Sequence, residues 1–189
     1  MPSPINKRRI FTMNNKKIQY LTRTAVMLAI TLIFMSLRLI PVLSDANPMS
    51  VYIIGSLVNL ALLVACDYVG FGAAVFNGIV APFVALLQGH QTLMFMVPVV
   101  AIGNIVLPSG YMLFKNRSNL KWLGVLFGSL LKFGFFLLVV PFVFQLFMSS
   151  PVAPRVAAQF LGYAQLITAL IGGYVAIIVV PLLRRALQN

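Results

Sequence analysis

The sequence predicts an all-α, polytopic membrane protein with six transmembrane helices and both termini in the cytoplasm. Hydrophobic residues make up 61% of the 189 residues and only 8% are charged, whereas soluble domains carry about 25% charged residues. Apolar stretches near the bilayer-spanning length of about 20 residues recur along the chain, separated by short polar loops. Such a chain has no room for a sizeable soluble core.

Each expected helix is bounded by polar, proline or glycine residues. The segment 1–18 is basic and is expected to be a flexible cytoplasmic extension, separate from a six-helix domain over 19–189. The first apolar run is longer than the core of a signal peptide, so we interpret it as a retained helix. The turn 67–70 joins the second and third helices into a hairpin. The expected helices cover residues 19–40, 50–66, 71–87, 93–114, 122–147 and 158–183.

The orientation follows from the basic residues, which give a net charge of +12. With six spans, the termini and the loops after the second and fourth helices lie on one side. That side carries most of the basic residues, namely Lys7, Arg8, Arg9, Lys16, Lys17, Arg23, Lys115, Arg117, Lys121, Arg184 and Arg185. The opposite side carries Arg38 and Arg155, so the positive-inside rule places the termini in the cytoplasm. The same charges favour contact with anionic lipid, and no soluble basic face exists to bind nucleic acid.

Lys132 lies near the middle of the fifth expected helix, beside the small residues Gly124, Gly128 and Ser129. Small-residue faces pack inward, and an ionisable group at this depth needs a partner or a wet cavity. The chain has no Glu, and its acids, Asp45 and Asp67, are expected near the two surfaces. One interpretation is that an anionic ligand neutralises Lys132. The other is that its amine reaches the cytosolic surface or is held by carbonyl groups and water.

Amide side chains recur in the same helices on faces rich in small residues. As single residues they are explained by hydrogen bonds between helices. Together with Lys132 they resemble the lining of a polar small-molecule pocket. The amides in question are Asn59, Asn77, Asn104 and Gln165. Further groups at the outer ends of the helices are candidates for the mouth of this pocket, namely Tyr163, Gln88, His90, Arg38 and Asn47.

The first helix carries Ala25-x-x-x-Ala29, a spacing that lets another helix approach closely. With the stretches from Ile54 to Gly72, Ala81 to Phe83 and Pro98 to Asn104, this pair resembles the substrate-binding S components of energy-coupling factor (ECF) vitamin transporters. The resemblance covers most of the chain after residue 19. It implies a bacterial plasma-membrane subunit that captures a vitamin from outside.

The resemblance also implies partners. S components dock on a transmembrane coupling protein that carries two cytosolic ATPases, and the Ala-x-x-x-Ala pair is the docking contact, a role that Ala25 and Ala29 would inherit. The subunit itself would be non-catalytic and need no cofactor. Pantothenate, with one carboxylate plus hydroxyl and amide groups, suits a Lys with several amides. A pyrimidine or pyridoxine-like precursor is the next candidate.

Other classes fit the sequence less well. An intramembrane enzyme needs a nucleophile with a base, or paired acids, at membrane depth, and a chain with one His and one Cys has no zinc cluster. A self-sufficient secondary transporter of a small organic anion remains the alternative, although such transporters favour membrane carboxylates and inverted repeats. A structural or assembly role is also open.

Overall fold

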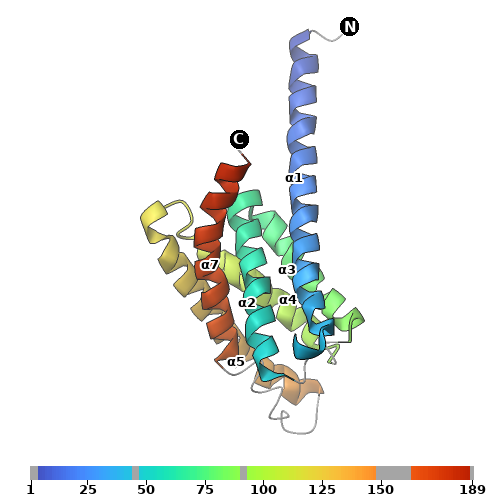
Figure 1. The fold of residues 1–189 in the computed structure, drawn as a ribbon, viewed down its shortest axis with the longest axis vertical. Helices are drawn as coiled ribbons and strands as arrows, with labels where there is room; N and C mark the ends of the chain where they lie inside the picture. Colours follow the sequence, from blue (N-terminus) through green and yellow to red (C-terminus); the bar gives the residue numbers. More distant parts are fainter. Residues whose placement is uncertain (1–3, 44–46, 90–92, 148–162, 188–189) are drawn as a thin grey trace.

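The computed structural model describes residues 4–43, 47–89, 93–147 and 163–187, and describes side chains from Asn15 onward. These residues form six α-helices and no strand, which confirms the all-α class (Figure 1). The α-helices are α1 (Pro4–Ser36), α2 (Pro48–Val64), α3 (Phe71–Leu87), α4 (Met96–Met112), α5 (Lys121–Phe147) and α7 (Ala164–Ala186). Short 3-10 turns cover Leu37–Leu39, Pro41–Leu43 and Ser118–Leu120.

The predicted start of the first helix is wrong by many residues. Helix α1 begins at Pro4, so the basic segment continues the helix and extends beyond the bundle (Figure 1). Between Pro4 and Pro41 the sequence contains no glycine or further proline that would break a helix. The helix ends at Ser36 and continues as the 3-10 turn Leu37–Leu39 instead of reaching residue 40.

The predicted tight turn at 67–70 is also corrected. Helix α2 continues into a π-helical segment, η3 (Ala65–Val69), and the chain reverses only at Gly70, whose φ of 144° suits glycine. A single π turn inserted in a helix is typical of functional or strained positions. Here it brings Asp67 into the interior, where it is 5% exposed.

Four segments are long and apolar enough to cross a membrane, namely Asn15–Leu39, Pro48–Val69, Lys121–Phe147 and Ala164–Ala186. Helices α3 and α4 are apolar but have 17 residues each, a length of about 25 Å against a hydrocarbon core of about 30 Å. The four long apolar helices indicate a membrane protein. That all six helices cross the membrane stays a prediction. Both termini and the connection from α4 to α5 lie toward one end of the bundle, as a six-span arrangement requires (Figure 1).

The helices pack around two apolar clusters. The larger cluster joins α2, α4, α5 and α7 in the half nearest the termini and includes Leu63, Leu107, Val125 and Val180. The smaller one lies between the other ends of α4 and α5 and includes Phe136 and Phe144. The most extensive helix–helix contacts are those of α2 with α7, α4 with α5 and α3 with α4. The polar residues of the candidate site lie between the two clusters.

Candidate binding site

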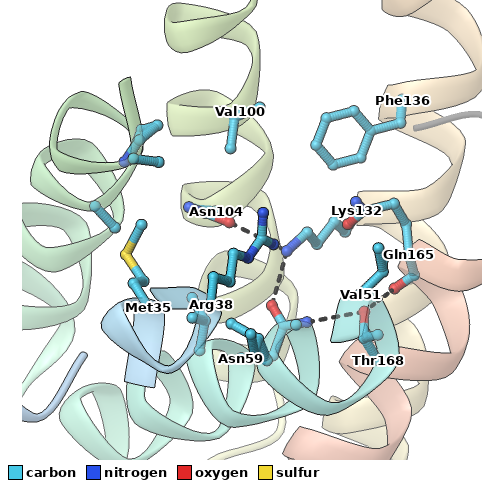
Figure 2. A pocket seen from close by; sticks show the side chains of 16 residues that line it. Met35, Arg38, Val51, Asn59, Val100, Asn104, Lys132, Phe136, Gln165 and Thr168 are labelled. Carbon is cyan, nitrogen blue, oxygen red and sulfur yellow. Dashed lines mark hydrogen bonds between the residues drawn. The ribbon is translucent and has the colours of Figure 1, made fainter. Parts of the chain in front are cut away.

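Lys132 points into the bundle and is 3% exposed. Its Nζ donates to Oδ1 of Asn59 at 2.7 Å and to Oδ1 of Asn104 at 3.1 Å (Figure 2). The ammonium therefore does not reach the surface of the bundle. Two side-chain carbonyl groups, from α2 and α4, hold it at the centre of the bundle. This is the arrangement that brings together three of the residues predicted from the sequence.

Glycines on α5 set the position of Lys132. A Cβ added at Gly128 would lie 2.5 Å from the carbonyl oxygen of Leu107, so α5 and α4 touch through their backbones. One helical turn further along α5, Lys132 lies opposite Asn104. Close approach through small residues is the usual way that membrane helices associate.

Glycines on α2 and α7 bring these two helices together at the same site. A Cβ at Gly172 would overlap the carbonyl oxygen of Ser56, and one at Gly55 would lie 3.0 Å from the side chain of Thr168. At this contact Nδ2 of Asn59 donates to Oγ1 of Thr168 at 3.2 Å, and that hydroxyl donates to the carbonyl oxygen of Gln165 at 3.3 Å. The amide of Asn59 is therefore held from both of its ends.

Because a lysine ammonium can only donate hydrogen bonds, it fixes the orientation of both amide side chains. Because an ammonium has three N–H groups and no acceptor, it must face the amide oxygens, so the NH₂ groups of Asn59 and Asn104 point away from it. Two of the three Lys132 donors are used. Each NH₂ group has two donors, and one of each is used, by Thr168 and by the carbonyl oxygen of Gly78. Among the described residues, one donor on each of the three side chains is left over.

These side chains line a cavity of about 110 Å³. Its wall includes polar groups from α2, α4, α5 and α7 and apolar groups from α1 to α5 (Figure 2). Within the described part of the chain no carboxylate lines it. The lining residues are Met35, Arg38, Val51, Ile54, Gly55, Val58, Asn59, Ala81, Pro82, Ala85, Val100, Asn104, Lys132, Phe136, Gln165 and Thr168.

Asp67 serves a different cluster. Its carboxylate accepts from the Tyr111 hydroxyl at 2.7 Å, from Lys121 Nζ at 2.8 Å and from Arg184 at 3.0 Å. Lys115 Nζ donates to the carbonyl oxygen of Cys66 at 2.7 Å beside it. These bonds tie η3 to α4, α5 and α7 at the end that holds the termini. The carboxylate is therefore already paired and does not neutralise Lys132.

The other predicted residues divide into two groups. Arg38 and Gln165 line the cavity with Lys132. Tyr163 does not, since it is 73% exposed and its ring stacks on Phe133 with centroids 6.0 Å apart. Asn77 is fully buried, lies outside the lining, and has no hydrogen-bond partner among the described residues.

Two predicted mouth residues make structural hydrogen bonds. Asn47 caps α2, accepting from the Met49 N–H at 3.0 Å and donating to the carbonyl oxygen of Val42. Gln88 donates to Ser36 Oγ at 2.9 Å and so ties α3 to α1. His90 lies outside the described residues.

The sequence reasoning missed Thr168, Pro82 and Phe136. Thr168 was visible one turn after Gln165, where a hydroxyl in an apolar helix is a candidate interhelical donor. Pro82 and Phe136 carry no polar signal at all, so only the packing of α3 and α5 reveals that they line the cavity.

Comparison with protein-family models, curated proteins and solved structures finds no match for this chain. Evidence for function therefore comes from its own residues and their geometry.

Proposed function

We propose that this protein is a membrane-embedded binding subunit that captures a small anionic vitamin or vitamin precursor for ATP-driven uptake by an ECF complex. The observation that carries the proposal is the Lys132 ammonium, which lies buried against a cavity and between two amide oxygens, with no carboxylate among the described residues of the lining. The subunit binds and hands over its ligand, and separate ATPases supply the energy.

The positive charge of Lys132 and the hydrogen-bond donors around it support an anionic ligand. A lysine at the centre of a membrane helix costs at least about 2.5–3.5 kcal/mol. Each hydrogen bond to a charged group stabilises it by about 1.5–3 kcal/mol net. The two amide oxygens therefore offset the cost of burying the ammonium, but they do not neutralise its charge. The remaining donors on Lys132, Asn59 and Asn104 match the acceptor-only oxygens of a carboxylate. A cationic ligand would meet repulsion and find few acceptors.

The vitamin candidates follow from this donor set. Pantothenate offers a carboxylate for Lys132 and hydroxyl and amide groups for the other polar residues of the lining. A pyrimidine or pyridoxine-like precursor is the next candidate. In either case Gln165, Thr168 and Arg38 lie on the same cavity as Lys132 and are placed to contact the polar remainder of the ligand.

The partner side of the proposal concerns α1. Ala25 and Ala29 are exposed, whereas Met27 and Thr31 of the same helix are buried against the bundle. An exposed small-residue pair on a membrane helix offers close backbone approach to another helix. We propose this face as the docking surface for a polytopic coupling protein that carries two cytosolic ATPases.

Two measurements on the purified full-length protein test the ligand. Native mass spectrometry would reveal a retained anion, and calorimetry with carboxylates from 2-hydroxyisovalerate to pantothenate would measure affinity. We expect Lys132→Met to weaken carboxylate binding at least about tenfold, or 1.4 kcal/mol. Leu131→Met, at a neighbouring residue that is 41% exposed, is the control and should bind as the wild type. Carboxylate binding that ignores Lys132→Met, or no binding by any member of the panel, would contradict the proposal.

A further inference from the structure

Three cations converge on the π-helical segment η3, at the end of the bundle that holds the termini. Lys115 Nζ donates to the carbonyl oxygen of Cys66 at 2.7 Å, and Lys121 Nζ donates to Oδ2 of Asp67 at 2.8 Å. Nη2 of Arg184 donates to the carbonyl oxygen and to Oδ1 of the same aspartate, at 2.9 Å and 3.0 Å. The turn after α4, the start of α5 and the end of α7 therefore each direct one positive charge at the same part of η3.

The charges of this cluster do not balance. Asp67 is the only acidic residue that the structure describes, and the other acid of the sequence, Asp45, lies outside the described residues. Three cations against one carboxylate leave an excess of two positive charges. Like charges held this close repel one another, so an additional anion would stabilise the cluster.

The three cations are accessible and keep hydrogen-bond donors for a ligand. The side chain of Arg184 is half exposed, and Lys115 and Lys121 are partly exposed. Among the described residues, each lysine uses one of its three N–H groups, and Arg184 uses only one nitrogen of its guanidinium. The other donors match the oxygens of a phosphate group, which ammonium and guanidinium groups bind through charge-assisted hydrogen bonds. Because bonds to η3 already order these side chains, binding an anion costs little further conformational entropy.

An exposed apolar residue lies within two positions of each cation. Leu113 precedes Lys115, Trp122 follows Lys121, and Leu182 precedes Arg184. Tryptophan beside cationic residues is typical of the membrane interface, where its ring lies at the depth of the lipid headgroups. The acidic surface of a soluble protein would leave these apolar side chains in water. A lipid covers them with its acyl chains while its phosphate meets the cations.

From the excess charge and its apolar surroundings we propose that this cluster binds the headgroup of an anionic phospholipid. The lipid phosphate lies against Lys115, Lys121 and Arg184, and the acyl chains lie along the exposed apolar side chains next to them. The sequence predicted diffuse contact of its basic residues with anionic lipid, and this proposal specifies where a headgroup binds. It goes beyond the proposed function and does not depend on it, because none of these residues lines the cavity at Lys132.

The test is thermal denaturation of the full-length protein in dodecyl maltoside micelles that contain dioleoyl phosphatidylglycerol or, at the same mole fraction, dioleoyl phosphatidylcholine. We expect the anionic lipid to raise the thermal midpoint by at least about 3 °C over the neutral lipid. Lys115→Gln combined with Arg184→Gln should remove about half of this difference or more. Lys115→Gln alone serves if the double variant does not fold.

Lys16→Gln combined with Lys17→Gln is the matched control. It removes the same number of positive charges from exposed positions in the N-terminal part of α1, at the same end of the protein (Figure 1). This variant should keep the full difference between the two lipids.

Three results would overturn the proposal. Equal midpoints of the wild-type protein in the two lipids would mean that the cluster binds no anionic headgroup. An equal loss in the control variant would mean that the lipid responds to the overall charge and not to this cluster. Stabilisation of the same size by glycerophosphoglycerol, which is the headgroup without acyl chains, or by poly-glutamate would assign the cluster to a free phosphate or to an acidic protein partner.

Discussion

The side-chain amide of Asn104 donates to the backbone carbonyl oxygen of Gly78 at 3.4 Å, across the contact between α3 and α4. In an unbroken helix this carbonyl would accept from the residue four positions later, but that residue is Pro82, which has no N–H. The proline therefore frees an acceptor for Asn104. With its NH₂ group engaged on α3, Asn104 presents its oxygen to Lys132.

This arrangement predicts the effect of Asn104→Asp. The substitution supplies Lys132 with a carboxylate, a group that the described lining of the cavity does not offer, at nearly unchanged side-chain volume. We expect carboxylate affinity measured by calorimetry to fall at least about tenfold, because the ammonium is already neutralised. The thermal midpoint should stay within a few degrees of wild type, since the new charge is paired.

Asn104→Leu provides the matched control, because it removes the amide without supplying a charge. It leaves the cation with one oxygen and should lower the thermal midpoint as well as the affinity. An Asn104→Asp protein that binds carboxylates like the wild type would show that Lys132 is not where the anion binds.

The sequence predicted the parts of this site that obey simple chemical rules. A cation at membrane depth on a small-residue face must point inward, and Lys132 does so. Amides near small residues must find partners, and Asn59 and Asn104 do so. The sequence could not predict that Lys132 selects these two amides and leaves Asn77 aside, because that choice depends on how α2, α3 and α4 are rotated and staggered. The sequence also could not predict the apolar wall of the cavity, because nothing in it distinguishes Phe136 from any other buried apolar residue.

The errors in the predicted fold also arise from tertiary contacts that the sequence does not reveal. The π segment Ala65–Val69 is stabilised by tertiary bonds to Asp67 from Tyr111, Lys121 and Arg184. No local signal distinguishes this from a turn before Gly70. Among the predicted mouth residues, Asn47 forms a cap and Gln88 forms a helix–helix hydrogen bond, and their partners Val42 and Ser36 are known only from the fold.

The contact of α7 with α2 predicts opposite effects for two glycine substitutions. Gly172→Ala places a Cβ over the carbonyl oxygen of Ser56 and 2.7 Å from the backbone nitrogen of Leu60. Backbone atoms cannot yield as side chains do, so α7 must move and the protein should lose about 1–3 kcal/mol of stability.

Gly134→Ala is the matched control on α5, since a Cβ there meets nothing within 4 Å. Alanine is the better helix former by about 0.8–1.0 kcal/mol, so Gly134→Ala should preserve or raise stability. Thermal denaturation in detergent, followed by circular dichroism, measures both variants. Equal losses in the two proteins would mean that α2 and α7 are not in backbone contact.

The Asp67 cluster predicts a graded loss of stability. Asp67→Asn removes the buried charge that pairs with Lys121 and Arg184, whose side chains are 22% and 49% exposed. Removing one partner of a fully buried pair costs about 3–5 kcal/mol. Solvent screens these partly exposed cations, so we expect a loss of about 1–3 kcal/mol.

Two arginine variants serve as references for the loss of stability in Asp67→Asn. Arg184→Gln should cost at most about 1 kcal/mol, because its guanidinium is half exposed. Arg185→Gln, at an exposed neighbour, should stay within about 0.5 kcal/mol of wild type. Detergent denaturation curves give the ranking. An Asp67→Asn protein as stable as Arg185→Gln would mean that the cluster does not hold η3 to the surrounding helices.

The exposed face of α1 predicts how the proposed ECF complex assembles. Ala25→Trp adds a large ring where Ala25 and Ala29 allow close approach, so the backbone of a partner helix would be pushed away by several ångströms. We expect tagged wild-type protein to co-purify with a polytopic coupling protein and two ATPases, and Ala25→Trp to lose all three while keeping wild-type affinity for carboxylates. Ile178→Trp is the matched control, because Ile178 is an exposed residue (64%) on α7, and it should retain the complex. If Ala25→Trp retains the three subunits as well as Ile178→Trp does, α1 is not the docking helix. If wild-type protein retains none of them but still transports a carboxylate, a self-sufficient carrier replaces the ECF assembly.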